Sequence, residues 1–282
     1  MRKAFVMVVT LFAVNASAQP ADTAKVKKPW THNLVGGLNL TQVSFSDNWA
    51  QGGENALAYA TTLNGKSDQD LPKTNWATSY KFAFGQTKLG EQGLRKSDDK
   101  IDVESNFTYK VGTYINPYVA ATLKTQFAKG FEYSLNAQGK TVAKQVSAFF
   151  DPGYLTQSAG LGYQPIPQIK TRLGAALREV ITSKFTNYAG GEKTKVEGGL
   201  ESVTEATWQL HSNLLFTGKL ELFDPFNNLD IIIMRSDNTL AAKVSKYVTV
   251  NFNVQLLKEP PVSRGKIQRK QTLAVGLSYS FL

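Results

Sequence analysis

Residues 247–257 read YVTVNFNVQLL, and this stretch decides how the rest of the chain is interpreted. Every second residue from Val248 to Leu256 is apolar, and the residues between them are threonine, asparagine and glutamine. Successive side chains of a β-strand point to opposite faces, so the alternation predicts a strand with one apolar and one polar face. Residues 271–281 alternate in the same way.

Extending this period along the chain predicts a series of long strands, at residues 34–45, 54–65, 74–86, 99–111, 115–127, 153–163, 168–180, 197–210, 213–223, 230–244, 247–257 and 271–281. Strands of soluble proteins usually have ~5–6 residues, whereas a tilted strand that crosses a bilayer needs ~9–11. In lipid an open sheet edge would leave backbone groups without hydrogen-bond partners. We therefore predict an all-β, antiparallel transmembrane β-barrel of about 12 strands, with both termini periplasmic.

The bulk composition hides this pattern. The chain has 282 residues, of which 42% are hydrophobic and 19% charged, and it has no cysteine. Its longest apolar run, residues 4–14, is shorter than the ~20 residues of a membrane-spanning helix. The missing cysteines exclude disulfides, thiol nucleophiles, cysteine-ligated metals and a lipid anchor on an N-terminal cysteine.

The N-terminus predicts export. Arg2 and Lys3 precede the apolar run, and an Ala-Ser-Ala motif before Gln19 is typical of a signal-peptide cleavage site. The expected location is the outer membrane of a Gram-negative cell. The predicted organisation is a signal peptide at 1–18, a periplasmic lead-in at 19–33 and a barrel at 34–282.

Aromatic residues give the predicted barrel an orientation. Five fall on outward positions at the periplasmic strand ends: Trp76, Tyr109, Tyr163, Trp208 and Phe281. Amphipathic rings are enriched where a barrel meets the lipid interface. In the alternative, a soluble sandwich, such rings would fill the core, and their gathering at strand ends would have no cause.

The polar face of the predicted strands carries charges of both signs. These expected lumen-lining residues are Asp102, Glu104, Lys124, Arg172, Arg178, Glu201, Glu205, Lys219 and Glu221. A twelve-strand barrel is wider than filled eight-strand barrels and narrower than 16-strand porins. Two hypotheses therefore stay open. The protein is a narrow pore or transport-related channel for small charged solutes, or a closed, salt-bridged barrel that serves as a structural or accessory subunit of an outer-membrane complex.

Several motifs occur in order along the chain: Asn48-Trp49-x-x-Gly52-Gly53-x-Asn55, Lys96-x-Asp98-Asp99, Thr125-Gln126-Phe127-x-x-Gly130 and Ser147-x-Phe149-x-x-Pro152-Gly153-Tyr154. Together they resemble a Bacteroidetes family of secreted, outer-membrane proteins known only as a domain of unknown function. The resemblance implies a barrel in the outer membrane of a diderm bacterium. It implies no activity and no site residues.

The first motif also has a physical interpretation. Its two glycines allow a tight reversal between strands, and Trp49 could fold over the barrel mouth, either to grip a ligand or to pack as a cap. In the second motif, two adjacent carboxylates fall short of the ~6 oxygen ligands that Ca²⁺ prefers. Pairing of these carboxylates with Lys100 or Arg95 is expected instead, and we predict neither a metal nor a cofactor.

Catalysis and nucleic-acid binding are not expected. Serine–histidine chemistry needs a positioned histidine, and both histidines, His32 and His211, fall on the predicted periplasmic side. No catalytic residue is predicted. The net charge of +10 is dispersed, and no nucleic-acid-binding motif is present. The expected partners are outer-membrane lipid, the barrel-insertion machinery and an unidentified outer-membrane protein.

Overall fold

The computed structural model describes residues 30–46, 53–259 and 266–281. The predicted signal peptide and most of the lead-in lie outside these residues. The described residues include one short 3-10 helix, η1 (Thr186–Ala189). The strands are β1 (Thr31–Val43), β2 (Ala56–Asp70), β3 (Thr74–Leu89), β4 (Arg95–Tyr109), β5 (Ile115–Thr125), β6 (Gly130–Leu135), β7 (Thr141–Ser147), β8 (Gly153–Ile166), β9 (Ile169–Ile181), β10 (Thr194–His211), β11 (Leu214–Pro225), β12 (Ile233–Lys243), β13 (Val248–Lys258) and β14 (Gln268–Ser280).

Twelve of these strands form one closed antiparallel barrel, which confirms the predicted fold class. Each strand pairs with its neighbours in the order β1-β14-β13-β12-β11-β10-β9-β8-β5-β4-β3-β2. The other two strands, β6 and β7, form a separate hairpin within the connection from β5 to β8. No helix within the described residues is long and apolar enough to cross a membrane.

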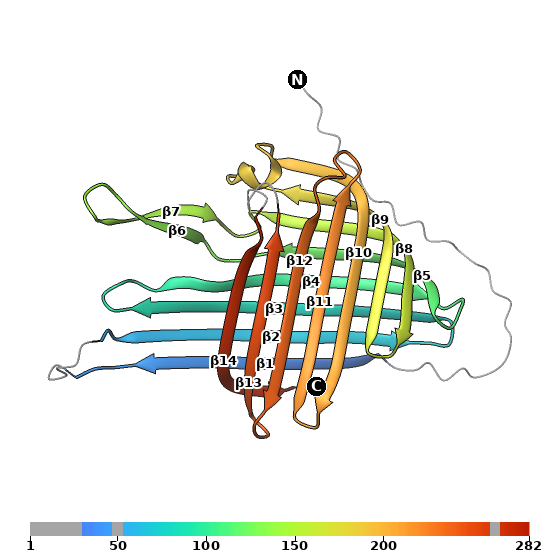
Figure 1. Ribbon diagram of the computed structural model, residues 1–282, viewed down its shortest axis with the longest axis horizontal. Helices are drawn as coiled ribbons and strands as arrows, with labels where there is room; N and C mark the ends of the chain where they lie inside the picture. The colour runs from blue at the N-terminus through green and yellow to red at the C-terminus, as the bar shows by residue number, and fades with distance from the viewer. Residues whose placement is uncertain (1–29, 47–52, 260–265, 282) are drawn as a thin grey trace.

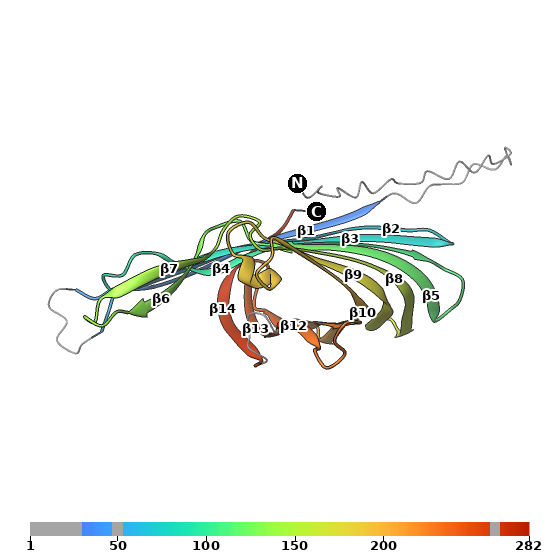
Figure 2. The same ribbon diagram turned by 90° about the horizontal axis from the view of Figure 1, so that it is seen from above.

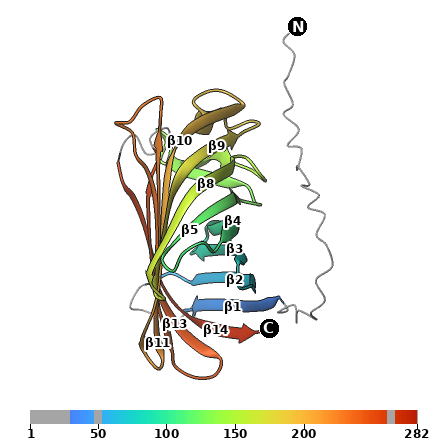
Figure 3. The same cartoon turned by 90° about the vertical axis from the view of Figure 1, so that its right-hand side faces the viewer.

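The barrel is flattened. Strands β1 to β4 form a nearly flat layer, and β11 to β14 run steeply across it (Figure 1). Seen from above, the second layer curves beneath the first and encloses the lumen (Figure 2), and the side view shows the same two walls (Figure 3). A strong strand tilt of this kind is how a sheet closes on itself. It brings β4 opposite β11 and β12.

The two ends of the barrel differ in their connections. At one end, where β1 begins and β14 ends, the turns are short: 71–73, 110–114, 167–168, 212–213 and 244–247. Most connections at the other end are longer, up to residues 126–152 between β5 and β8, and the exception is the five-residue connection 90–94 between β3 and β4. Such an asymmetry is typical of outer-membrane barrels, whose short turns are periplasmic.

Strand β2 is longer than the alternation predicts. It continues through residues 66–70, which are all polar and lack an apolar face. The Asn75 side-chain amide donates to Asp68 and Asp70 at 3.3 Å each and holds this end in register. At the end of a strand both faces can contact water, so apolar and polar residues need not alternate there. The sequence pattern therefore left residues 65–73 as a long connection, whereas the actual turn has three residues, 71–73.

Asp99 anchors the base of the β6–β7 hairpin. Its carboxylate accepts hydrogen bonds from the backbone N–H groups of Phe127 and Ala128, both at 2.9 Å, and pairs with Lys96 at 2.8 Å. The expected pairing with Lys100 or Arg95 is wrong for this carboxylate. Arg95 instead lies over the ring of Tyr133 in β6, 4.0 Å from its centroid. The motif around Asp99 thus has a structural role.

The first-loop motif is only partly described. Asn48, Trp49 and Gly52 lie outside the described residues. Gly53 has φ +133°, and a Cβ at this position would collide with the Phe45 ring, so only glycine fits the reversal. The Asn55 side chain accepts a hydrogen bond from the Phe45 N–H at 2.7 Å, which closes the same turn.

The outer face of the barrel is rich in exposed apolar side chains. The five predicted interface aromatics, Trp76, Tyr109, Tyr163, Trp208 and Phe281, are 44–58% exposed and lie near the short-turn end. Between the ends, large aliphatic side chains such as Leu173 and Leu273 are also exposed. An outward apolar surface of this extent has no partner in the described chain and is unusual for a soluble monomer.

Candidate functional site

The lumen holds the charged side chains of the barrel strands. Among the nine predicted charges, Asp102, Glu104, Arg172, Arg178 and Glu201 are buried, and Lys124, Lys219, Glu221 and Glu205 are partly exposed. These residues come from β4, β5, β9, β10 and β11. The strand alternation directs them to one face, and closure of the barrel makes that face the interior.

Glu104 is the centre of this interior. Its side chain is buried, and Oε1 accepts a hydrogen bond from Arg172 Nη1 at 2.5 Å. The ammonium group of Lys219 binds the other carboxylate oxygen. The three residues lie on β4, β9 and β11, which are not neighbours in the sheet. These ion pairs therefore cross the lumen.

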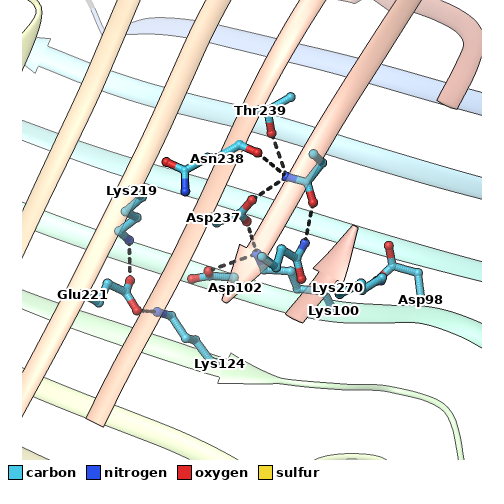
Figure 4. A network of polar contacts seen from close by, with 12 residues as sticks. Asp98, Lys100, Asp102, Lys124, Lys219, Glu221, Asp237, Asn238, Thr239 and Lys270 are labelled. Atoms are coloured by element: carbon cyan, nitrogen blue, oxygen red, sulfur yellow. Dashed lines mark hydrogen bonds and ion pairs between the residues drawn. The ribbon is translucent and has the colours of Figure 1, made fainter. Parts of the chain in front are cut away.

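Further ion pairs lie beside this centre, and Figure 4 shows them as two neighbouring groups. Glu221 lies between Lys219, at 2.8 Å, and Lys124. Nearby, Lys100 on β4 binds Asp237 on β12 at 2.9 Å. These pairs thus join β4 and β5 on one wall to β11 and β12 on the opposite wall.

Several interior charges were missing from the predicted set, among them Asp237 and the two lysines that line both cavities, Lys81 and Lys100. Arg235 and Asp237 face inward with Thr239 on β12, so alternation read through residues 230–244 would have found them. Glu197 lies on the inner face of β10, directly opposite Arg178 in the register. Glu259 follows the last residue of β13 and gave no periodic signal.

Glu259 forms ion pairs at the long-loop end of the lumen. It is 2% exposed and binds Arg235 at 2.8 Å and also Arg178. Both guanidinium groups stack over the Tyr154 ring, at 4.4 and 5.3 Å from its centroid. Burial alone would raise the pKa of the Glu259 carboxyl, but Arg235 and Arg178 outweigh it and hold the pKa below its usual range.

This lowered pKa predicts a pH-dependent contribution to stability. The Glu259 carboxylate stabilises the fold fully above the pKa of an unfolded glutamate, about 4.3, and loses that contribution as the pH falls through its lower folded value. We expect Glu259→Gln to lower the denaturant midpoint at pH 7, and the gap from wild type to shrink on acidification below pH ~4. Equilibrium unfolding in detergent at stepped pH measures this gap. A gap that is constant with pH would contradict the assignment.

Two cavities flank the Lys100–Asp237 pair. The first, of about 460 Å³, is lined by seven cationic and five anionic side chains. The second, of about 550 Å³, is lined mainly by amide, hydroxyl and aliphatic side chains from β1, β2, β13 and β14. Lys81, Lys100 and Asp237 line both. Among the described residues, Lys81 has no carboxylate within 4.0 Å, unlike Lys100.

Neither histidine lies in these cavities. His32 Nδ1 is 2.8 Å from the Ser67 hydroxyl, which also accepts a hydrogen bond from Tyr80 at 2.6 Å. His211 contacts Asn213 beside a short turn. In the part of the chain that the structure describes, no three histidine, aspartate or glutamate side chains gather as metal ligands.

The fold and interior define a class: a closed antiparallel β-barrel with a cross-braced, charged lumen and two polar cavities. Two families match parts of the chain. Residues 40–131 match a Protein of unknown function (DUF3078), and residues 153–281 match a Protein of unknown function, DUF481. No curated protein matches. The two matched segments meet at the β6–β7 hairpin, and the barrel closes only when the strands of both are joined.

Several solved structures are similar to the chain at low identity. They include the NanC porin, with 11% identity, a TM-score of 0.38, and coverage of 88% of this chain and 97% of that one. The translocator domain of the autotransporter NalP from Neisseria meningitidis has 10% identity, a TM-score of 0.39, and coverage of 89% and 87%. An outer membrane channel from Pseudomonas putida F1 has 8% identity, a TM-score of 0.39, and coverage of 93% and 99%.

Proposed function

We propose that this protein is an outer-membrane β-barrel that forms a narrow channel for small charged solutes, with a preference for anions. The observation that carries this proposal is the pair of polar cavities that share Lys81, Lys100 and Asp237. Barrel strands of 11–18 residues and an apolar outer face support membrane insertion. The short turns and both chain ends then face the periplasm.

Charge supports the anion preference. Cationic side chains outnumber anionic ones around the first cavity, seven to five. Most of them are neutralised by ion pairs, but Lys81 has no carboxylate within ion-pair distance among the described residues. An ammonium group without an ion-pair partner attracts anions and repels cations when it lines a low-dielectric lumen.

The ion pairs that cross the lumen favour a second candidate function. Glu104, Arg172 and Lys219 join opposite walls of the barrel. If these pairs close the lumen completely, the barrel is a structural or accessory subunit of an outer-membrane complex. In either case we expect the partners to be membrane lipid and the machinery that inserts barrels into the membrane. Phe281, which directly follows β14, is the aromatic residue that this machinery would recognise.

Lys81→Glu tests the channel and its charge preference together. We expect wild-type protein in planar bilayers to show small conductance steps, and a KCl gradient to give a reversal potential of anionic sign. The substitution should lower the chloride-to-potassium permeability ratio by about threefold or more, because it replaces the unpaired cation with an anion.

The matched control is Lys88→Glu. Lys88 lies on the same strand, is exposed and lines neither cavity, so the same change in charge should leave the permeability ratio close to that of wild type. No conductance steps from correctly inserted wild-type protein would contradict the channel and favour the accessory barrel.

A further inference from the structure

The contact between the first and last strands is much shorter than any other in the barrel. Only residues 35–39 of β1 pair with residues 276–280 of β14, whereas the other neighbouring strands share at least eight paired residues. Beyond this contact β14 runs steeply away from β1 (Figure 1). Residues 40–43 and 268–275, which are all described, thus have no strand across this gap, which we call the β1–β14 seam.

The larger cavity reaches this seam. It is lined by six consecutive β14 residues, 270–275, and by Asn39 and Thr41 of β1. On the fully paired strands β2 and β3 at most three consecutive residues line this cavity, 58–60 and 81–83. The run of six on β14 lies along the edge that has no partner strand, so the cavity follows this free edge and opens sideways through the wall.

The two sides of the seam differ in polarity. On the outside, Leu40, Leu273 and Val275 are 58–70% exposed. On the inside, the same cavity is lined by amide and hydroxyl side chains and by the ammonium group of Lys81. Backbone N–H and C=O groups at an unpaired strand edge are costly when they contact only lipid. A ligand that brings a polar group to this edge is therefore favoured.

We propose that the β1–β14 seam is a lateral binding site for a single-chain amphiphile with an anionic head group. The hydrocarbon tail lies outside the wall against Leu40 and Leu273, and the head group enters the cavity toward Lys81. A volume of about 550 Å³ is within the ~300–1,000 Å³ range of small-molecule sites. The seam lies in the half of the wall away from the chain ends, so the ligand enters from the outer leaflet.

The same register suggests how the site closes. If the pairing of Leu38 with Leu277 continued by two residues, Leu40 would meet Val275. The double variant Leu40→Cys/Val275→Cys therefore places a disulfide across the closed seam. The chain has no other cysteine. Leu38→Cys/Leu277→Cys is the matched control, since these residues point to the same outer face and are already paired.

The probe is an alkyl phosphate with a photoreactive group in its tail, added to the full chain in phospholipid vesicles. We expect labelling of residues 40–43 and 268–275, mapped by mass spectrometry. Oxidation of the seam variant should abolish this labelling and reduction should restore it, whereas the control variant should label equally in both states. Lys81→Gln should weaken labelling by the phosphate about tenfold or more, the size of one charge-assisted hydrogen bond. Labelling by an alkyl maltoside of equal chain length should not change.

Equal labelling of the oxidised and reduced seam variant would overturn the proposal, as would labelling spread evenly over the outer wall. If the disulfide does not form, the comparison of the two probes in Lys81→Gln decides: an equal loss for both excludes an anionic head group at Lys81. Stronger labelling by a two-chain phospholipid probe would assign the seam to bulk lipid instead. None of these readouts depends on conductance along the barrel axis. The seam site can therefore be disproved without disproving the channel, and the channel can be disproved without disproving the seam site.

Discussion

Replacing Glu104 by glutamine is expected to lower the free energy of unfolding by about 3–5 kcal/mol, the usual cost of removing one partner from a buried ion pair. The carboxylate is 5% exposed and neutralises both Arg172 and Lys219. Glutamine keeps the shape of the side chain but leaves Arg172 without an ion-pair partner among the described residues, while Lys219 keeps only Glu221. A buried charge without a partner costs more than the pair itself contributed.

Urea unfolding of protein refolded in detergent micelles, followed by tryptophan fluorescence, measures this loss. Asp98→Asn is the control. It removes one carboxylate from an ion pair with Lys270 at 3.0 Å, but both side chains are partly exposed, so the expected loss is at most ~1 kcal/mol. Equal losses of unfolding free energy in the two variants would show that the ion pairs of Glu104 across the lumen do not stabilise the barrel.

Removal of both Lys100 and Asp237 should widen the passage between the two cavities. The double variant Lys100→Ala/Asp237→Ala removes an ion pair whose two members both line the shared border of the cavities. Unlike a single substitution, it leaves neither member of the pair as an unpaired charge. Buried Asp102 loses its 3.9 Å contact with Lys100, so we expect a loss of stability, but a smaller one than for Glu104→Gln. We expect the single-channel conductance in planar bilayers to rise about twofold or more.

An ion pair outside both cavities gives the control for this experiment. Lys66 and Asp68 pair at 3.5 Å near the short-turn end of β2, and neither residue lines a cavity. Lys66→Ala/Asp68→Ala should therefore leave the conductance nearly unchanged. Unaltered conductance in the Lys100/Asp237 variant would mean that solutes follow a path that avoids this border, or that the lumen is closed elsewhere.

The alternation predicted the barrel closely because one rule governs nearly every strand. Residues 247–257 were expected as a strand, and β13 spans Val248–Lys258. The rule failed where strands extend into polar segments, as in residues 66–70 of β2 and at the start of β4. It also left the β6–β7 hairpin within a long connection, since these strands have only six and seven residues, fewer than the ~9–11 of a strand that crosses a bilayer.

The candidate site was predictable only in part. Alternation selects inward positions, so Glu104, Lys124 and Arg172 were identified from the sequence. It does not reveal which strands lie opposite one another, so the partners of these charges were not predictable. Glu259 lies beyond the end of β13, where no period operates, although it binds two arginines of the lumen.

By itself the sequence determined the fold class, the face on which each strand residue lies and the places where most strands begin and end. These properties are local, because they follow from the two-residue period of a strand. Only the tertiary structure decided that Glu104 meets Lys219, that Lys100 meets Asp237 and that β1 and β14 part beyond residue 39. Those contacts depend on the tilt and flattening of the closed barrel, which arise from the register of all twelve strands together.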